Sequence, residues 1–270
     1  MMRKALQRNR LIAVILTAAI VLMLLGAGVA KAASIDFAGD DFMILDAKTG
    51  DQIGNVHYAV SSPATGHQEV TSFARYNDGT YDVERDDFDT TKGGDLPVMF
   101  DYEHTFYKSN GTVFLLIKAD FRDGDAVCAS YADGEPHALK ETLNFPSSTY
   151  VGAAMMLPMR QALRQSISNP IELYDFVCIP GPKLIKVEIQ PEPPGTWNHY
   201  PGDLVRTNIK PDFGIFSFAV DLFVPDMYAW FNPSNGYNFV GGKFARYYKG
   251  PEIILARKAI TAPTTVTGIH

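Results

Sequence analysis

Cysteine is scarce in this chain, with only Cys128 and Cys178 among 270 residues. Their spacing matches neither a C-x-x-C redox motif nor a zinc-ligand pattern, which argues against thiol-redox enzymes and structural zinc domains. The chain also lacks a G-x-S-x-G nucleophile motif, and none of its six histidines forms an H-E-x-x-H or H-x-x-x-H pair. These absences argue against the familiar serine hydrolases and zinc peptidases.

Motifs for phosphate and calcium are missing as well. Gly241-Gly242-Lys243 lacks the spacing of a P-loop, and the acidic runs at 40–41 and 86–89 do not follow the calcium-loop pattern. Asp101 and Glu103 share one face of a predicted strand, which we interpret as a solvated face. We therefore expect no metal site and no cofactor.

Residues 1–32 have the pattern of a secretory signal peptide. Four basic residues come first, Leu11–Ala30 carries no charge, and Ala30-Lys31-Ala32 provides an A-x-A cleavage site before Ala33. The alternative is an uncleaved anchor, because residues 11–30 are about long enough to span a bilayer as a helix. We expect a periplasmic protein after cleavage, or one anchored to the inner membrane by residues 11–30, which would then be its membrane contact.

Removal of this leader makes the protein strongly acidic. Five of the 24 basic residues and none of the 30 acidic residues precede Ala33, which leaves 19 basic residues and a net charge of −11. Such a charge repels phosphate backbones, so we expect no nucleic-acid partner. Residues 33–260 are expected to form a single β-rich extracytoplasmic domain, and residues 261–270 a flexible tail.

Short apolar or alternating segments, separated by turn residues, fill the sequence after Phe42. Asn-Gly and Asp-Gly steps mark hairpins at 77–79, 109–111, 123–125 and 133–135. One segment, Ser147–Ser168, instead has the periodicity of an amphipathic helix. The predicted fold class is therefore mainly β: a large curled antiparallel sheet or barrel of roughly a dozen strands with one inserted helix.

Methionines and aromatic residues suggest a pocket inside such a sheet. A curled sheet of roughly a dozen strands can enclose more space than its own side chains fill, and flexible Met suits an apolar ligand. The same residue types are ordinary core fillers, which is the alternative interpretation. The candidate pocket residues lie on the helix and on a C-terminal aromatic strand: Met155, Met156, Met159, Leu163, Ile167, Trp230 and Phe231.

Export changes what the two cysteines can do. In an oxidising compartment Cys128 and Cys178 can pair as a disulfide that closes a long loop. The alternative is that both are small, buried apolar side chains. The spacing alone leaves both interpretations open.

Three segments carry a resemblance to known proteins: the hairpin Asp78-Gly79-Thr80-Tyr81, the helix Tyr150–Ile167 and the strand Met227–Pro233. Their order resembles an uncharacterised bacterial periplasmic β-rich family, a domain of unknown function. The chain is also distantly similar to the half-barrel lipoprotein and lipid carriers, which cradle acyl chains between a curved sheet and helices, although it has one helical segment where they have several. The resemblance implies a periplasmic β fold and supplies no catalytic residues.

Together these observations favour a non-enzymatic periplasmic protein that binds or carries an apolar, lipid-like molecule. One alternative is a structural or interaction module of the bacterial envelope, which would engage a protein partner through strand edges. Another is an enzyme with two facing carboxylates in a polar cleft, such as a glycosidase. The three hypotheses differ in the interior that they require: an apolar cavity, a filled core or a polar cleft.

Overall fold

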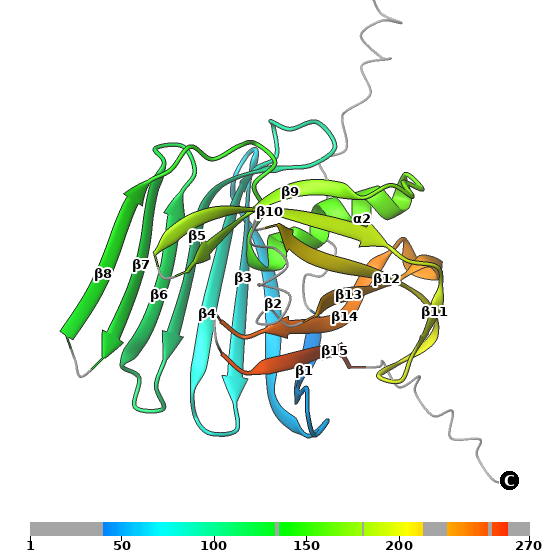
Figure 1. Ribbon diagram of the computed structural model, residues 1–270, viewed down its shortest axis with the longest axis horizontal. Coiled ribbons are helices and arrows are strands. Elements are labelled where there is room, and N and C mark those ends of the chain that lie inside the picture. The colour runs from blue at the N-terminus through cyan, green and yellow to red at the C-terminus, as the bar shows by residue number, and fades with distance from the viewer. Residues whose placement is uncertain (1–39, 133–134, 180, 213–225, 248–249, 259–270) are drawn as a thin grey trace, which may run out of the picture. The chain divides into compact units, whose positions relative to one another are not determined.

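Strands make up most of the residues that the computed structural model describes, and they form one 15-stranded sheet (Figure 1). The described residues are 40–132, 135–179, 181–212, 226–247 and 250–258, and all of them belong to one compact unit, residues 35–270. The predicted leader, 1–32, and the predicted tail, 261–270, lie outside them. Within the described ranges, no helix has both the length and the apolar character needed to cross a bilayer.

The first eight strands pair with one another in the order of the chain, as an antiparallel meander. Each hairpin joins neighbours in the sheet, as the turn signals predict. The strands are β1 (Asp41–Asp46), β2 (Gln52–Ala64), β3 (His67–Tyr76), β4 (Tyr81–Asp89), β5 (Val98–Tyr107), β6 (Val113–Asp120), β7 (Asp125–Ala132) and β8 (Glu135–Thr142).

The other strands follow the helical segment and extend the same sheet from its opposite side. They are β9 (Ile171–Cys178), β10 (Pro182–Pro191), β11 (Gly195–Trp197), β12 (Tyr200–Asp212), β13 (Met227–Asn232), β14 (Asn238–Ala245) and β15 (Glu252–Arg257), with the short 3-10 turn η3 (Pro233–Asn235) between β13 and β14. Their order in the sheet is β15-β14-β13-β12-β10-β9, and β11 pairs only with β12. Because β15 pairs with β1, the two halves form one open sheet with β8 and β9 at its edges. The predicted fold class, a large antiparallel sheet with one inserted helix, is confirmed.

Turn chemistry explains why the meander forms from this sequence. In the β3–β4 turn, the side chain of Asp78 accepts a hydrogen bond from the amide of Thr80 at 2.9 Å, and Gly79 adopts a φ of 85°. The β5–β6 turn repeats the arrangement, because Asn110 accepts from the amide two residues later at 3.0 Å and Gly111 has a φ of 82°. Glycine adopts this left-handed conformation without steric cost, so each pair of strands is joined by a tight, hydrogen-bonded turn.

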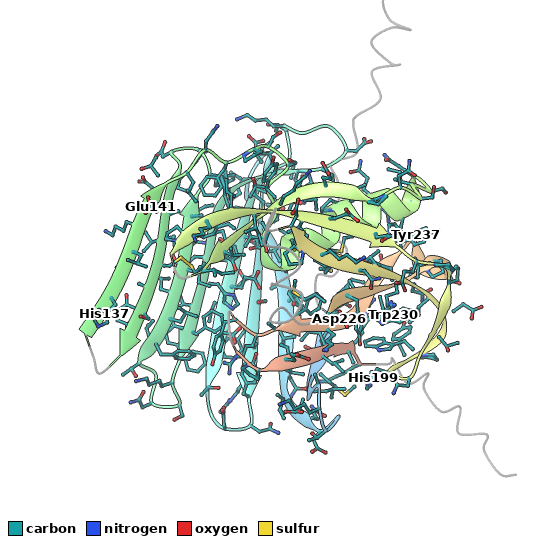
Figure 2. All side chains as sticks on the ribbon, viewed as in Figure 1. His137, Glu141, His199, Asp226, Trp230 and Tyr237 are labelled. Atoms are coloured by element: carbon teal, nitrogen blue, oxygen red, sulfur yellow. A yellow bond between two sulfur atoms is a disulfide. The ribbon has the colours of Figure 1, made fainter. Side chains whose placement is uncertain are left out.

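The sheet curls until its two edges approach each other. Cys128 on β7 and Cys178 on β9 form a disulfide with their Cα atoms 5.8 Å apart, and β10 contacts both β7 and β8. Figure 2 draws the sulfur–sulfur bond in yellow. Since β9 is one edge and β7 lies one strand in from the other, the disulfide links the two ends of the sheet. The chain between β8 and β9 therefore crosses from one edge of the sheet to the other, and this crossing segment contains the helix.

The helix is shorter than the sequence predicts. A 3-10 turn, η1 (Gly152–Met155), leads into α2 (Met156–Arg164), whereas helical periodicity extends over 147–168. Thr149 instead forms an isolated parallel bridge to β9, which keeps the chain before η1 extended. At the other end Ser166 has a φ of 54°, and this left-handed conformation ends the helix.

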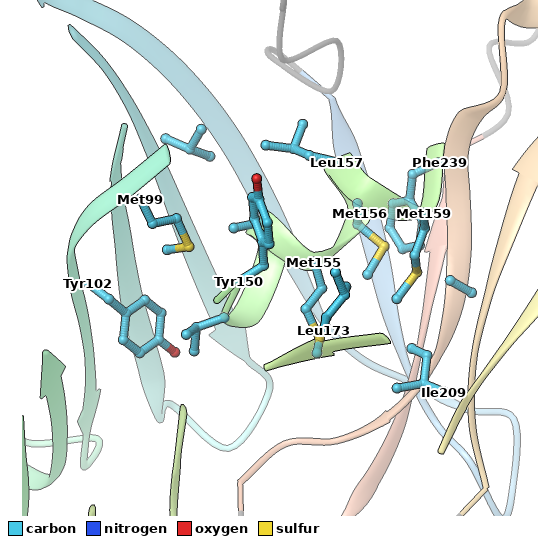
Figure 3. Packing of buried hydrophobic residues seen from close by; sticks show 14 of the residues in the cluster. Met99, Tyr102, Tyr150, Met155, Met156, Leu157, Met159, Leu173, Ile209 and Phe239 are labelled. Carbon is cyan, nitrogen blue, oxygen red and sulfur yellow. The ribbon is translucent and has the colours of Figure 1, made fainter. Parts of the chain in front are cut away.

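Buried side chains form two clusters on opposite faces of the sheet. The larger one joins the inner face to η1 and α2, and Figure 3 shows part of it around Met155 and Leu173. The smaller one lies on the outer face of β13, β14, β15 and β1, beneath the hairpin of β11 and β12. Ile253 belongs to the first cluster and Ile254 to the second, as the alternation of a strand requires.

Candidate functional site

A cavity of about 1450 Å³ opens on the inner face of the curled sheet. Every strand except β11 contributes at least one lining residue, together with η1 and α2. Ordinary ligand pockets measure roughly 300–1000 Å³, so this one is large. The curled sheet therefore encloses space that its own side chains leave unfilled.

Strand register arranges much of the cavity floor in two cross-strand rows, in which each residue lies directly opposite the next. The first row contains Tyr58, Ser72, Glu84, His104, Ile117 and Cys128, and it ends at Leu139 on β8. The second contains Val56, Ala74, Asp82, Phe106, Leu115 and Ser130. Polar and charged groups come mostly from β3 to β5, whereas β6 to β8 supply mostly apolar groups. The floor is therefore amphipathic.

Asp82 is buried on this floor but is electrically neutralised. Its Oδ2 atom lies 3.2 Å from Nη2 of Arg246, and its Oδ1 atom lies 3.0 Å from Nε2 of His104. Burial alone lowers the pKa of His104, but the hydrogen bond to Asp82 and the charges of Glu84 and Asp82 outweigh burial and raise that pKa. The ion pair between Asp82 and Arg246 holds Arg246, the residue that follows β14, against β4.

The turn between β14 and β15 forms part of the cavity wall. The guanidinium of Arg246 lies 3.5 Å from the centre of the Tyr76 ring, a cation–π contact. The ring of Tyr247 meets Phe106 and Phe114 edge-on, with centroids 5.6 and 6.0 Å apart. These contacts connect the C-terminal strands to β3, β5 and β6 across the cavity.

Two further carboxyl groups line the cavity from different halves of the sheet, Glu84 on β4 and Asp175 on β9. Glu84 accepts hydrogen bonds from the amide of Ala153 at 2.9 Å and from the hydroxyl of Ser72 at 3.4 Å. Burial raises the pKa of Asp175 to about 7; the amide of Phe176 opposes this rise and the charge of Glu84 adds to it. The cavity thus combines an apolar floor with carboxyl groups that can bind a polar group or exchange a proton near neutral pH.

The methionines and aliphatic residues that were predicted to line a pocket from the helix have different surroundings in the structure. Met155 and Met156 line the cavity. Met159 is fully buried in the larger cluster (Figure 3), where its sulfur lies 3.5 Å from the Thr207 hydroxyl. Leu163 belongs to the same cluster. The predicted methionine wall is therefore limited to two residues, because helical periodicity identifies the buried side of a helix without showing whether it meets a cavity or a packed core.

The remaining predicted pocket residues also lie away from the cavity. Phe231 is fully buried in the larger cluster, and Ile167, which follows α2, is partly buried; neither is a lining residue. Trp230 belongs to the outer cluster and stacks on Trp197 at a centroid distance of 5.9 Å. Figure 2 shows Trp230 far from His137 of β8. Neighbours on a strand point to opposite faces, so Trp230 and Phe231 could not both face one pocket.

The acidic row on β4 is a feature of the cavity that was not predicted from the sequence. Asp82, Glu84 and Asp86 are spaced by two, which places all three on one face of a strand. The acidic run at 86–89 does not form a metal cluster with its neighbours, since the described residues hold no group of three His, Cys, Asp or Glu side chains arranged for a metal ion. The spacing was a usable signal for a shared face, but it could not show that this face is the inner one.

No protein-family model matches the sequence, and no curated protein is significantly similar to it. Among solved structures, the chain is similar to a β-barrel-like protein of a domain of unknown function, DUF1849, from Brucella abortus. The match covers 82% of this chain and 96% of that chain, at 10% sequence identity and a TM-score of 0.47.

Proposed function

We propose that this chain is a non-enzymatic binding or carrier protein for an amphipathic, lipid-like molecule. The observation that carries the proposal is the cavity of about 1450 Å³ with an apolar floor on β6 to β8. Burial of an apolar ligand there would contribute roughly 25 cal/mol per Å² before the entropy of association is subtracted. Met155 and Met156 add flexible side chains that adapt to a pliable ligand.

The exposure of Leu139 inside the cavity supports this proposal. This side chain lines the cavity, yet 50% of its surface is exposed, unlike the packed side chains of the core. An apolar ligand lying along the row from Ile117 to Leu139 would cover that surface. Phe73 offers a matched comparison, because it is 45% exposed on the outer face of β3, beside Tyr81.

The test compares Leu139→Ser with Phe73→Ser. Both variants should fold, because both side chains are half exposed. Leu139→Ser should weaken the binding of dodecanol by about tenfold, since most of a buried leucine's transfer free energy is lost, while Phe73→Ser should leave it unchanged. Binding is best followed by calorimetry, because Trp197 and Trp230 lie outside the cavity and are poor reporters.

Native mass spectrometry of protein purified from the envelope would show a bound amphiphile directly. The proposal is wrong if folded protein carries no lipid and shows neither heat of binding nor a rise in Tm across a broad panel of lipids.

We further propose that the protein works in the periplasm. The basic and apolar leader supports export, and the Cys128–Cys178 disulfide suits an oxidising compartment. Intact mass of the envelope protein should correspond to a chain beginning at Ala33. A mass that includes Met1 would instead indicate an anchor formed by residues 11–30.

An envelope interaction module is the second candidate, because β8 is an edge strand that could pair with a strand of a partner protein. If so, Ala138→Pro on β8 should abolish a complex with an envelope protein that Phe73→Ser preserves, as measured by co-purification with a defined partner. A complex that is unaffected by Ala138→Pro would exclude pairing at this edge.

A further inference from the structure

Among the described residues, the acidic charges along the cavity wall are not all balanced by cations. Four acidic side chains line the cavity: Asp82, Glu84, Asp175 and Glu252. Asp82 is paired with Arg246, and Glu252 lies 2.6 Å from Lys243. In the part of the chain that the structure describes, Glu84 and Asp175 have no Lys, Arg or His within ion-pair distance.

Glu84 is held in place by backbone fitted closely around it. Ala153 donates its amide to Oε1 at 2.9 Å, and Gly152 adopts a φ of 54° beside the same oxygen. A Cβ atom on Gly152 would lie 1.7 Å from that oxygen, so the approach of η1 requires glycine. The carboxylate is therefore fixed at the cavity wall and is not a mobile surface acid.

A third carboxyl group beside Glu84 is buried without a paired cation among the described residues, although the amide of Ala154 partly offsets the effect of burial on its pKa. Asp86 lies on the same side of β4, is 1% exposed, and neither of its oxygens makes a well-formed hydrogen bond to a described residue. Burial and the charge of Glu84 raise the pKa of Asp86 well above its usual range. Across the cavity, burial likewise raises the pKa of Asp175. Buried carboxyl groups respond in this way when no cation is near, so a cation supplied from outside would be bound favourably.

We infer that the ligand of this cavity carries a basic group, such as a protonated amine, which Glu84 and Asp175 hold while its apolar body lies along β6 to β8. The inference rests on the proposed function and names its ligand class: a cationic amphiphile. A fatty acid would place its own carboxylate against Glu84 and would be repelled. A neutral alcohol would gain the apolar contacts without the charge pairing.

This arrangement makes binding of the amine dependent on pH. Asp175 faces Glu84 of β4, Tyr102 of β5 and the amide of Phe176, and the cavity also holds the paired Asp82, His104 and Arg246. As the pH falls below about 7, Asp175 gains a proton and its charge is lost. His104, whose pKa is raised above its usual value, gains positive charge as the pH falls. Both changes weaken the attraction for an amine.

The experiment compares three probes with the same alkyl chain, dodecylamine, dodecanol and dodecanoate, by calorimetry on the wild-type protein. Near pH 8 the amine should bind about tenfold more tightly than the alcohol, and the alcohol more tightly than the carboxylate. Near pH 5.5 the advantage of the amine should shrink to about threefold or less. Asp175→Asn and Glu84→Gln should each reduce that advantage near pH 8.

Leu139→Ser separates this inference from the proposed function. This variant should weaken the binding of all three probes by a similar factor, because it removes an apolar contact only. If no probe binds to folded protein, the proposed function and this inference both fail. If the alcohol or the carboxylate binds as tightly as the amine near pH 8, the inference is overturned while the proposed function stands. The comparison on wild-type protein decides the matter even if Glu84→Gln fails to fold.

Discussion

At the scale of single residues, β4 shows how three acids on one strand face reach three different states. Asp82 is neutralised by Arg246 and His104, Glu84 is held by a backbone amide, and Asp86 is buried with no paired cation in the part of the chain that the structure describes. The residue types are nearly the same, and the spacing is regular. What differs is the set of groups that the curled sheet brings next to each carboxyl, and for Asp86 burial raises the pKa well above its usual range.

Asp175→Asn tests this conclusion through stability. The pKa of Asp175 is raised from 3.8 to about 7, so between these pH values the folded protein holds a proton that the unfolded chain has lost. Wild-type stability therefore falls as pH rises through this window and stays reduced above it. The variant should be more stable than wild type near pH 8, by up to about 4 kcal/mol and by less where cavity water screens the charge, with no gain near pH 4. Urea unfolding at both pH values measures the difference, and an equal gain at each pH would contradict the assignment.

At the scale of elements, α2 joins the two halves of the sheet. Its buried residues share a cluster with inner-face residues of β2 and β4 as well as with Leu173 of β9 and Ile209 of β12. At its C-terminal end, Arg160 and Arg164 both donate to the carbonyl oxygen of Gly236, at 3.2 and 2.9 Å, which ties the helix to the turn after η3. The helix therefore has two roles, because Met155 and Met156 line the cavity while later residues pack the core.

Met159 distinguishes the packing role from the binding role. It is 0% exposed and away from the cavity lining, so Met159→Ala should reduce the free energy of unfolding by about 2–5 kcal/mol through the space that it leaves. Met159→Leu conserves volume and should cost less than about 1.5 kcal/mol. Urea unfolding of both variants, with dodecanol binding measured on the folded protein, provides the comparison. A loss of binding without a loss of stability in Met159→Ala would place this residue in the pocket after all.

At the scale of the whole sheet, the Cys128–Cys178 disulfide decides how the edges meet. The two cysteines are 50 residues apart, and the chain between them contains β8, η1 and α2. Both sulfur-bearing residues also line the cavity. The covalent link therefore keeps β9 close to β7 and limits how far the cavity can open.

Reduction should loosen this closure. A disulfide that closes a loop of this length contributes about 4 kcal/mol by restricting the unfolded chain. Wild-type protein should lose roughly that amount in urea unfolding when a reductant is added, whereas the double variant Cys128→Ala, Cys178→Ala should not respond to reductant. Unfolded, unreduced wild-type protein should contain no titratable thiol. Two free thiols per chain, or a stability indifferent to reductant, would argue against the link.

Much of the fold could be predicted from local signals. Asp78-Gly79 and Asn110-Gly111 form turns because each glycine accepts the left-handed backbone and each Asp or Asn side chain accepts a hydrogen bond from the amide two residues later, whatever the rest of the chain does. Periodicity of two or of 3.6 residues likewise follows from local geometry, so the strands and the single helix could be expected. The helix ends were less predictable, because Thr149 pairs with a strand that comes later in the chain.

The candidate site was decided by tertiary structure. The sequence shows that Asp82, Glu84 and Asp86 share a strand face and that Met155 and Met159 share a helix, but not which faces meet. Only the curling of the sheet brings Glu84 and Asp175 into one cavity and places Met155 at that cavity while Met159 packs in the core. The physical reason is that backbone geometry is set by neighbours along the chain, whereas burial and charge depend on residues far apart in sequence, which only the closed arrangement of strands brings together.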